Sequence, residues 1–164
     1  MNAQKLILPG VGAFDWAMER LNGSGLKETL ETLVLCQKVP ILGICVGMQM
    51  MAKRSDEGIL PGLGWFDAEV IRFKPDSQCL PHMGWNNVTQ NYSNSLFNDL
   101  IDPRFYFLHS YFFSPCDPHC SLATTDYGIE FTSAAVNENI FGVQFHPEKS
   151  HHWGMKLLQN FVEL

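Results

Sequence analysis

A cysteine lies at the centre of the segment Gly43-Ile-Cys45-Val-Gly47, between the apolar run 39–44 and a helical pattern over 46–53. This succession of strand, turn and helix has the spacing of a nucleophile elbow, with cysteine where many hydrolases carry serine. The two glycines remove the Cβ atoms that would obstruct so tight a turn. The helix dipole there favours the Cys45 thiolate, and the Val46 amide can donate to an oxyanion. Taken alone, the pattern is more typical of a buried core cysteine between two packing glycines.

A histidine and a carboxylate lie together near the C-terminus, in Phe145-His-Pro-Glu148. If this segment is extended, residues two apart project from the same face, so Glu148 can hold the imidazole of His146. Such a carboxylate selects one tautomer and stabilises the imidazolium that a general base becomes. On its own, the pair is also typical of a strand end at the surface. Combined with the elbow, it predicts a catalytic triad of Cys45, His146 and Glu148.

A glycine-rich turn, Pro9-Gly-Val-Gly12, follows the short apolar strand 6–8. It lacks the GK[ST] ending of a phosphate-binding loop. Backbone amides in such a turn can approach a reaction intermediate closely, which favours Val11 as a second oxyanion donor beside Val46. A plain tight turn remains the alternative.

Composition excludes several classes of function. The chain has 164 residues, of which 46% are apolar and 17% charged, and this is typical of a globular protein. A net charge of −6 with scattered basic residues argues against a nucleic-acid partner. The apolar run near the N-terminus is too short for a signal peptide or a membrane span. We therefore expect a cytoplasmic protein that does not contact membranes.

The cysteines indicate reduced thiols, because their number is odd and no secretory leader precedes them. They are Cys36, Cys45, Cys79, Cys116 and Cys120. Cys116, His119 and Cys120 are close enough in sequence to suggest a metal site, but structural zinc requires four ligands and no second pair stands out. We therefore expect neither a metal nor a cofactor.

The pattern of apolar residues and turn residues predicts one mixed α/β domain that spans residues 1–164. Helices are expected over 14–21, 26–36, 46–53 and 151–162. Strands are expected over 6–8, 39–44, 65–73, 84–89, 105–114, 121–127, 131–137 and 140–145, with a hairpin turn at 137–139. The first half is typical of a doubly wound parallel sheet, and the second half adds antiparallel strands.

Five segments, in the same order, resemble class I glutamine amidotransferases. They are PGVGAF (9–14), PILGICVGMQ (40–49), PHMGWN (81–86), FLHSY (107–111) and GVQFHPEKS (142–150). Within this family, the match most resembles the glutaminase subunits of imidazole glycerol phosphate synthases. The resemblance implies a flavodoxin-like fold and assigns the triad to Cys45, His146 and Glu148.

The resemblance also implies a reaction and a partner. Glutamine is hydrolysed to glutamate, and the ammonia passes to a (β/α)₈ synthase subunit that forms imidazole glycerol phosphate and AICAR in histidine biosynthesis. Residues expected to line the glutamine pocket are Gly12, Gln49, His109, Ser110 and Tyr111. Those expected to face the partner in a heterodimer are Pro81, Met83 and Trp85.

Two departures from the family pattern lead to further expectations. Family members begin with a strand and a helix ahead of the PGVG strand, and this sequence lacks both, so we expect an unpaired sheet edge. The run Lys149-Ser-His-His-Trp153 and Trp65 resemble paralogues that feed sugar amidination for surface polysaccharides, which is an alternative acceptor. The same motifs are also compatible with a stand-alone cysteine hydrolase or with a non-catalytic fragment.

Overall fold

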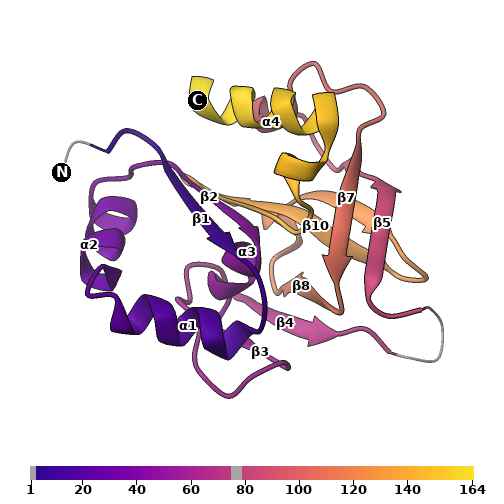
Figure 1. Ribbon diagram of the computed structural model, residues 1–164. Coiled ribbons are helices and arrows are strands. Elements are labelled where there is room, and N and C mark those ends of the chain that lie inside the picture. The colour runs from indigo at the N-terminus through magenta and orange to yellow at the C-terminus, as the bar shows by residue number, and fades with distance from the viewer. Residues whose placement is uncertain (1–2, 75–78) are drawn as a thin grey trace.

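The computed structural model describes residues 3–74 and 79–164 (Figure 1). Its α-helices are α1 (Phe14–Gly23), α2 (Lys27–Glu31), α3 (Val46–Met50) and α4 (His151–Glu163). A π-helical turn, η1 (Thr32–Cys36), continues α2, and the 3₁₀ turns are η2 (Ser95–Phe97), η3 (Pro118–Cys120) and η4 (Pro147–Lys149). The strands are β1 (Leu6–Gly10), β2 (Ile41–Cys45), β3 (Arg54–Ser55), β4 (Ala68–Arg72), β5 (His82–Asn87), β6 (Thr89–Gln90), β7 (Arg104–His109), β8 (Tyr111–Pro115), β9 (Ser121–Asp126), β10 (Glu130–Asn137) and β11 (Ile140–Val143).

A nine-stranded sheet forms the centre of the fold, in the order β1-β2-β11-β10-β8-β4-β3. The two remaining strands branch from β10: β9 pairs with β10, and β6 pairs with β9. Strands β1, β2 and β11 are mutually parallel, whereas β10 is antiparallel to β11, β8 and β9. The expected fold class, a parallel core with an antiparallel addition, is confirmed. Within the described residues β1 is an end strand of this sheet and pairs with β2.

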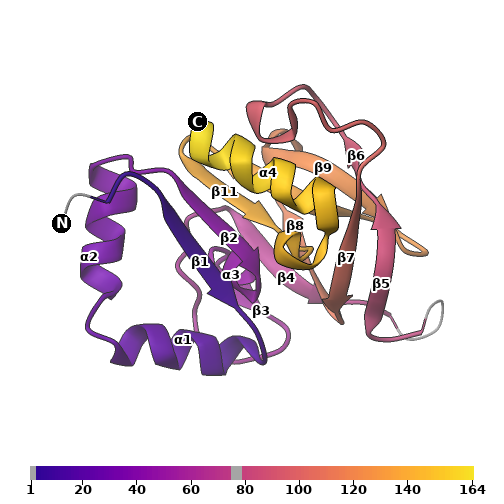
Figure 2. The same ribbon diagram turned by 45° about the horizontal axis from the view of Figure 1, so that its top comes forward.

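The two faces of the parallel core pack against different helices (Figure 2). Side chains alternate along β2, so Ile41 and Gly43 face one side while Leu42 and Ile44 face the other. Ile41 packs in a buried cluster with Met48 of α3. Leu42 and Ile44 belong to a second buried cluster, to which α4 contributes Leu157 and Phe161. Helices α3 and α4 therefore fix β2 from opposite sides.

A strand predicted over 105–114 is broken at Ser110. Its first part, β7, pairs with β5 in a separate two-stranded sheet, where His82 lies opposite His109. Its second part, β8, pairs with β4 and β10 of the central sheet. The prediction of one strand was wrong because no glycine or proline marks the break, and the two halves find different pairing partners. Strands β7 and β8 consequently meet at a junction between the two sheets (Figure 1). His109 is the last residue of β7 and Tyr111 the first of β8.

Several expected elements have different bounds. The helix predicted to reach residue 53 ends at Met50, whose carbonyl accepts from the Leu63 amide, so the following loop caps it. The strand predicted from residue 65 begins at Ala68, after Trp65 and Phe66 have entered the core. The predicted hairpin between β10 and β11 is confirmed, with Asn137 opposite Ile140.

Candidate active site

Cys45 ends β2 and directly precedes α3, as the elbow pattern predicts. Its backbone lies in the left-handed region, with φ 53° and ψ −113°, a conformation that costs about 1–3 kcal/mol for a residue other than glycine. The flanking glycines allow the close approach that holds it there. A Cβ on Gly47 would overlap the Leu8 carbonyl oxygen, and one on Gly43 would lie 2.8 Å from the Met48 nitrogen.

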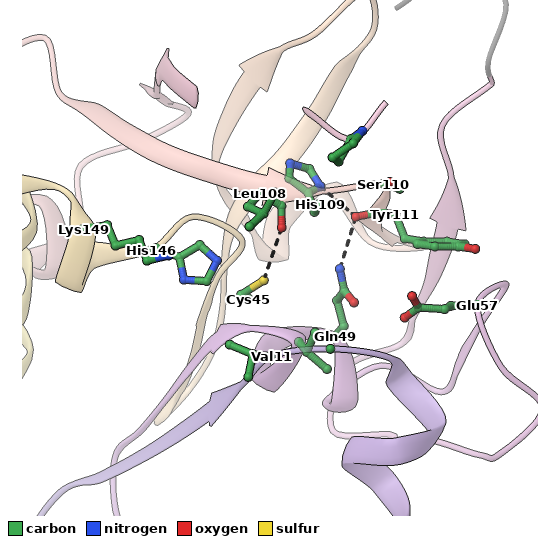
Figure 3. Close-up of a pocket in the computed structure, with 13 residues that line it drawn as sticks. Val11, Cys45, Gln49, Glu57, Leu108, His109, Ser110, Tyr111, His146 and Lys149 are labelled. Carbon is green, nitrogen blue, oxygen red and sulfur yellow. Dashed lines mark hydrogen bonds between the residues drawn. The ribbon is translucent and has the colours of Figure 1, made fainter. Parts of the chain in front are cut away.

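Cys45 is only 4% exposed. Its Sγ lies 4.0 Å from the Leu108 carbonyl oxygen, to which the thiol donates (Figure 3). The same sulfur is 3.7 Å from the amide nitrogen of Gln144. Burial raises the pKa of the thiol to about 11, although a hydrogen bond from the Val46 amide lowers it. The amide at the start of α3 therefore favours the thiolate, as expected, but desolvation outweighs it and the resting thiol keeps a raised pKa.

His146 and Glu148 form a hydrogen-bonded pair, with 2.7 Å between Nδ1 and Oε1. The predicted extended segment is wrong, because His146 is the N-cap of η4 and the 3₁₀ turn brings Glu148 back to the imidazole. The backbone is held by a bond from the His146 amide to the Tyr106 carbonyl and by one from the Ser150 hydroxyl to the His146 carbonyl. With Nδ1 engaged, Nε2 is the ring atom left for proton transfer.

The imidazole of His146 and the sulfur of Cys45 face the same space (Figure 3). Among the described residues no hydrogen bond joins them, which is common in ligand-free sites whose contacts tighten when substrate binds. The space is a cavity of about 310 Å³, a volume suited to a small molecule. Its lining includes most of the predicted site residues, namely Val11, Gly12, Cys45, Val46, Gln49, Pro81, His109, Ser110, Tyr111 and His146.

Two buried histidines lie beside this cavity. His109 Nδ1 donates to the Tyr111 carbonyl at 2.8 Å, and His82 Nδ1 is 2.9 Å from His109 Nε2. Burial lowers the pKa of His82 to about 4 and that of His109 to about 3. Both rings are therefore neutral at physiological pH and add no positive charge to the site.

Pro81, Met83 and Trp85, which are expected to face the partner, lie in different environments. Pro81 lines the cavity, whereas the Met83 and Trp85 side chains lie outside it, 64% and 37% exposed. The Trp85 indole stacks on the His151 imidazole, with ring centroids 5.1 Å apart. Trp85 therefore lies at the surface rather than in a strand core.

Similarity to a known family extends over almost the entire sequence. The family model described as "Glutamine amidotransferase class-I" matches residues 2–164. The chain belongs to the class-I glutamine amidotransferase family. Membership confirms the expected kind of enzyme, a glutamine amidotransferase.

Relatives of this amidotransferase are similar over nearly its whole length. A protein from Bdellovibrio bacteriovorus named imidazole glycerol phosphate synthase subunit HisH is 58% identical over 167 residues, which cover 99% of this chain and 82% of that protein. A Leptospira interrogans protein of the same name is 48% identical over 165 residues, which cover 98% of this chain and 81% of that protein.

Solved structures share the fold of this amidotransferase. A glutamine amidotransferase from Thermotoga maritima superposes with a TM-score of 0.64 at 21% identity, covering 98% of this chain and 63% of that one. The PurLQS structure from the same organism gives a TM-score of 0.72 at 15% identity, and the superposition covers 99% of this chain and 80% of that one. At these identities the likeness shows the fold alone.

The amidotransferase site contains residues that sequence reasoning missed. Glu57, Leu108 and Lys149 line the cavity, and Gln144 contacts the sulfur of Cys45. Glu57 lies in a charged run that is typical of a solvent-exposed loop, but its carboxylate accepts from the Phe14 amide at the start of α1. No local signal distinguishes it from a surface residue, because α1 brings it to the cavity through tertiary contact.

Two further findings concern the described part of the amidotransferase. No group of three or more His, Cys, Asp or Glu side chains within residues 3–74 and 79–164 is arranged to hold a metal ion. Across the same residues, each helix is too short or too polar to cross a membrane.

Proposed function

We propose that this chain is the glutaminase subunit of an imidazole glycerol phosphate synthase, forming one amidotransferase domain over residues 1–164. The observation that carries the proposal is that side chains from distant parts of the sequence meet at one cavity. Cys45 from β2 and His146 from the segment after β11 face one cavity, and Glu148 holds the imidazole from behind. Nucleophile, base and orienting carboxylate thus occupy the positions that acyl transfer requires.

Hydrolysis of glutamine follows from this arrangement. The resting thiol is protonated, so His146 takes its proton as the sulfur attacks the side-chain carboxamide carbon. The amides of Val46 and Val11 stabilise the oxyanion. His146 then protonates the departing ammonia and leaves a thioester on Cys45. The same imidazole activates water, which releases glutamate and restores the thiol.

The cavity also contains groups suited to the amino-acid end of glutamine. Glu57 is half-buried at its wall, and one carboxylate oxygen is held by the Phe14 amide. A carboxylate fixed in this way can pair with the α-ammonium of the substrate. We assign Gly12, Gln49, His109, Ser110 and Tyr111 to contacts with the rest of the molecule, because all five line the same cavity.

The partner is a (β/α)₈ synthase subunit, and together the two form a heterodimer in the cytoplasm. Ammonia released into water would be protonated and diluted, so the cavity must open toward the protein that consumes it. Met83 and Trp85 on β5 are exposed apolar side chains, and Pro81 of the same segment lines the cavity. Aromatic and methionine side chains of this kind are typical interface anchors.

The names of the relatives from Bdellovibrio bacteriovorus and Leptospira interrogans support an imidazole glycerol phosphate synthase as the enzyme that uses the ammonia. They do not favour sugar amidination, a stand-alone hydrolase or a non-catalytic fragment. The test is glutamine-dependent formation of imidazole glycerol phosphate by this chain mixed with a synthase barrel and its nucleotide substrate. Glutamate should form in equal amount. A mixture that makes product from added ammonia but not from glutamine would overturn the proposal.

A further inference from the structure

The Gln144 side chain is fully buried directly beside the nucleophile. It follows β11, which pairs in parallel with β2 so that Val143 lies opposite Ile44, and the next residues along are Gln144 and Cys45. The Gln144 amide accepts from Gln49 Nε2 at 3.0 Å and has its own nitrogen 3.7 Å from Cys45 Sγ. The mechanism described above does not use this side chain.

The orientation of both amides follows from one backbone carbonyl. The Tyr111 oxygen can only accept hydrogen bonds, and Gln49 Nε2 lies 3.2 Å from it (Figure 3). Gln49 must therefore direct its NH₂ group there, and its second hydrogen reaches the oxygen of Gln144. The nitrogen of Gln144 is consequently turned toward the sulfur.

The same carbonyl ends a second series of hydrogen bonds, which begins on β5. His109 donates to Tyr111 from Nδ1, so the Nε2 of this neutral ring accepts from His82 Nδ1. His82 Nε2 in turn accepts from the Asn86 amide at 3.3 Å, and that amide also donates to the Asp126 carbonyl. Every donor and acceptor role in this series is determined by the carbonyl at its end.

We propose that Gln144 is a catalytic hydrogen-bond donor to the Cys45 sulfur, and that His82 is a positioning residue that maintains the orientation of Gln144. His82 acts through His109, the Tyr111 carbonyl and Gln49. The proposal rests on the role of Cys45 as the nucleophile. It makes the thiolate that attacks glutamine a hydrogen-bonded anion rather than an isolated buried charge.

The charges around the sulfur show why such a donor matters. Burial is the main cause of the raised pKa of Cys45, and the carboxylates of Glu148 and Glu57 raise it further. Hydrogen bonds from the Val46 amide and from Gln144 lower it. Among the described residues, the basic side chains that line the same cavity are His146, Lys149 and His109, whose ring is neutral. Losing one hydrogen bond to an anion should raise the thiol pKa by roughly one unit.

Alkylation of Cys45 by iodoacetamide tests this without glutamine turnover, so its outcome is independent of the proposed enzymatic function. The full chain is treated over a range of alkaline pH, and mass spectrometry locates the adduct. Gln144→Met keeps the length of the side chain but removes the donor. In Gln144→Met, the fraction of Cys45 present as thiolate should fall about tenfold. A thiolate of higher pKa is intrinsically more nucleophilic, so the rate of alkylation should fall only about threefold. Gln144→Glu, which presents a carboxylate to the sulfur, should lower the rate further.

One control variant separates this effect from a loss of stability, and two variants of His82 test its positioning role. Asn160 is another buried amide, which donates to the Leu96 and Asn98 carbonyls and not to the site, so Asn160→Leu should leave the rate unchanged. His82→Leu should slow alkylation. His82→Asn, which can keep an N–H near the Nδ1 position, should restore the rate. A Gln144→Met or Gln144→Glu chain alkylated as fast as the unaltered protein, or an equal fall in Asn160→Leu, would overturn the proposal.

Discussion

Acidification below about pH 6.5 should destabilise this protein through His82 and His109. Burial holds the pKa of His82 at about 4 and that of His109 at about 3, whereas each titrates near about 6.5 in the unfolded chain. Between these values the unfolded state binds more protons than the folded state. Stability is therefore full above the unfolded pKa and is lost as the pH falls toward the folded pKa.

The expected loss is large because two groups contribute. Between about pH 7.5 and about pH 4.5, each histidine should remove about 2.5 kcal/mol from the free energy of unfolding, and the pair about 5 kcal/mol. Typical domains are stable by only about 5–15 kcal/mol. The exposed carboxyls of Asp67 and Glu138 have pKa values held below their usual range by Lys53 and Lys38, so they titrate below this window.

Urea denaturation followed by circular dichroism at several pH values measures this loss. His82→Asn, which does not titrate in this range, should lose about half as much stability on acidification as the unaltered chain. His119→Asn, the same substitution at an exposed position, is the control for the change of residue itself. The reasoning is refuted if the unfolding free energy is the same at both ends of the window, or if His82→Asn is as acid-sensitive as the unaltered protein.

Three more predictions concern the site. Cys45→Ala should abolish glutaminase activity, and a glutamine-derived chloroketone should label Cys45; an adduct on another cysteine would contradict the assignment. His146→Ala should lower turnover by roughly 10²–10⁴-fold, and by more than Glu148→Gln does, because the imidazole transfers the proton whereas the carboxylate only orients the imidazole. Near-normal rates for both variants would place the base elsewhere. Trp85→Ala should weaken binding to the synthase barrel by roughly thirtyfold, or about 2 kcal/mol, with little change in melting temperature; calorimetry showing unchanged affinity and a large fall in stability would make Trp85 a core residue.

Local patterns predicted the parts of the site that depend on short-range geometry. The elbow around Cys45 follows from two glycines, an apolar run and a helix start, all within a few residues. The pairing of His146 with Glu148 was also predicted, although a 3₁₀ turn and not an extended strand brings the two together. The residue types were decisive there, because a short turn and a strand can both bring neighbouring side chains into contact.

Tertiary contacts decided what the patterns missed. The run containing Ser110 is rich in aromatic residues on both sides of that serine and has no glycine or proline, so only the pairing of β7 with β5 reveals the break. Gln144 lies between two apolar residues and gives no sign that its amide meets Cys45 on a neighbouring strand. The raised pKa of Cys45 likewise depends on burial by distant segments, which the sequence does not show.

The parallel register between β2 and β11 has a consequence for engineering. Cys45 and Gln144 follow paired residues of adjacent strands, so their separation is set by the hydrogen-bonded ladder and not by the long stretch of chain between them. Loops within that stretch can be lengthened or shortened, as long as the ladder forms, without changing the spacing of the two side chains. A one-residue slip of β11 would instead turn Gln144 to the opposite face of the sheet. Variation in this protein should therefore be tolerated in loop length and not in strand alignment.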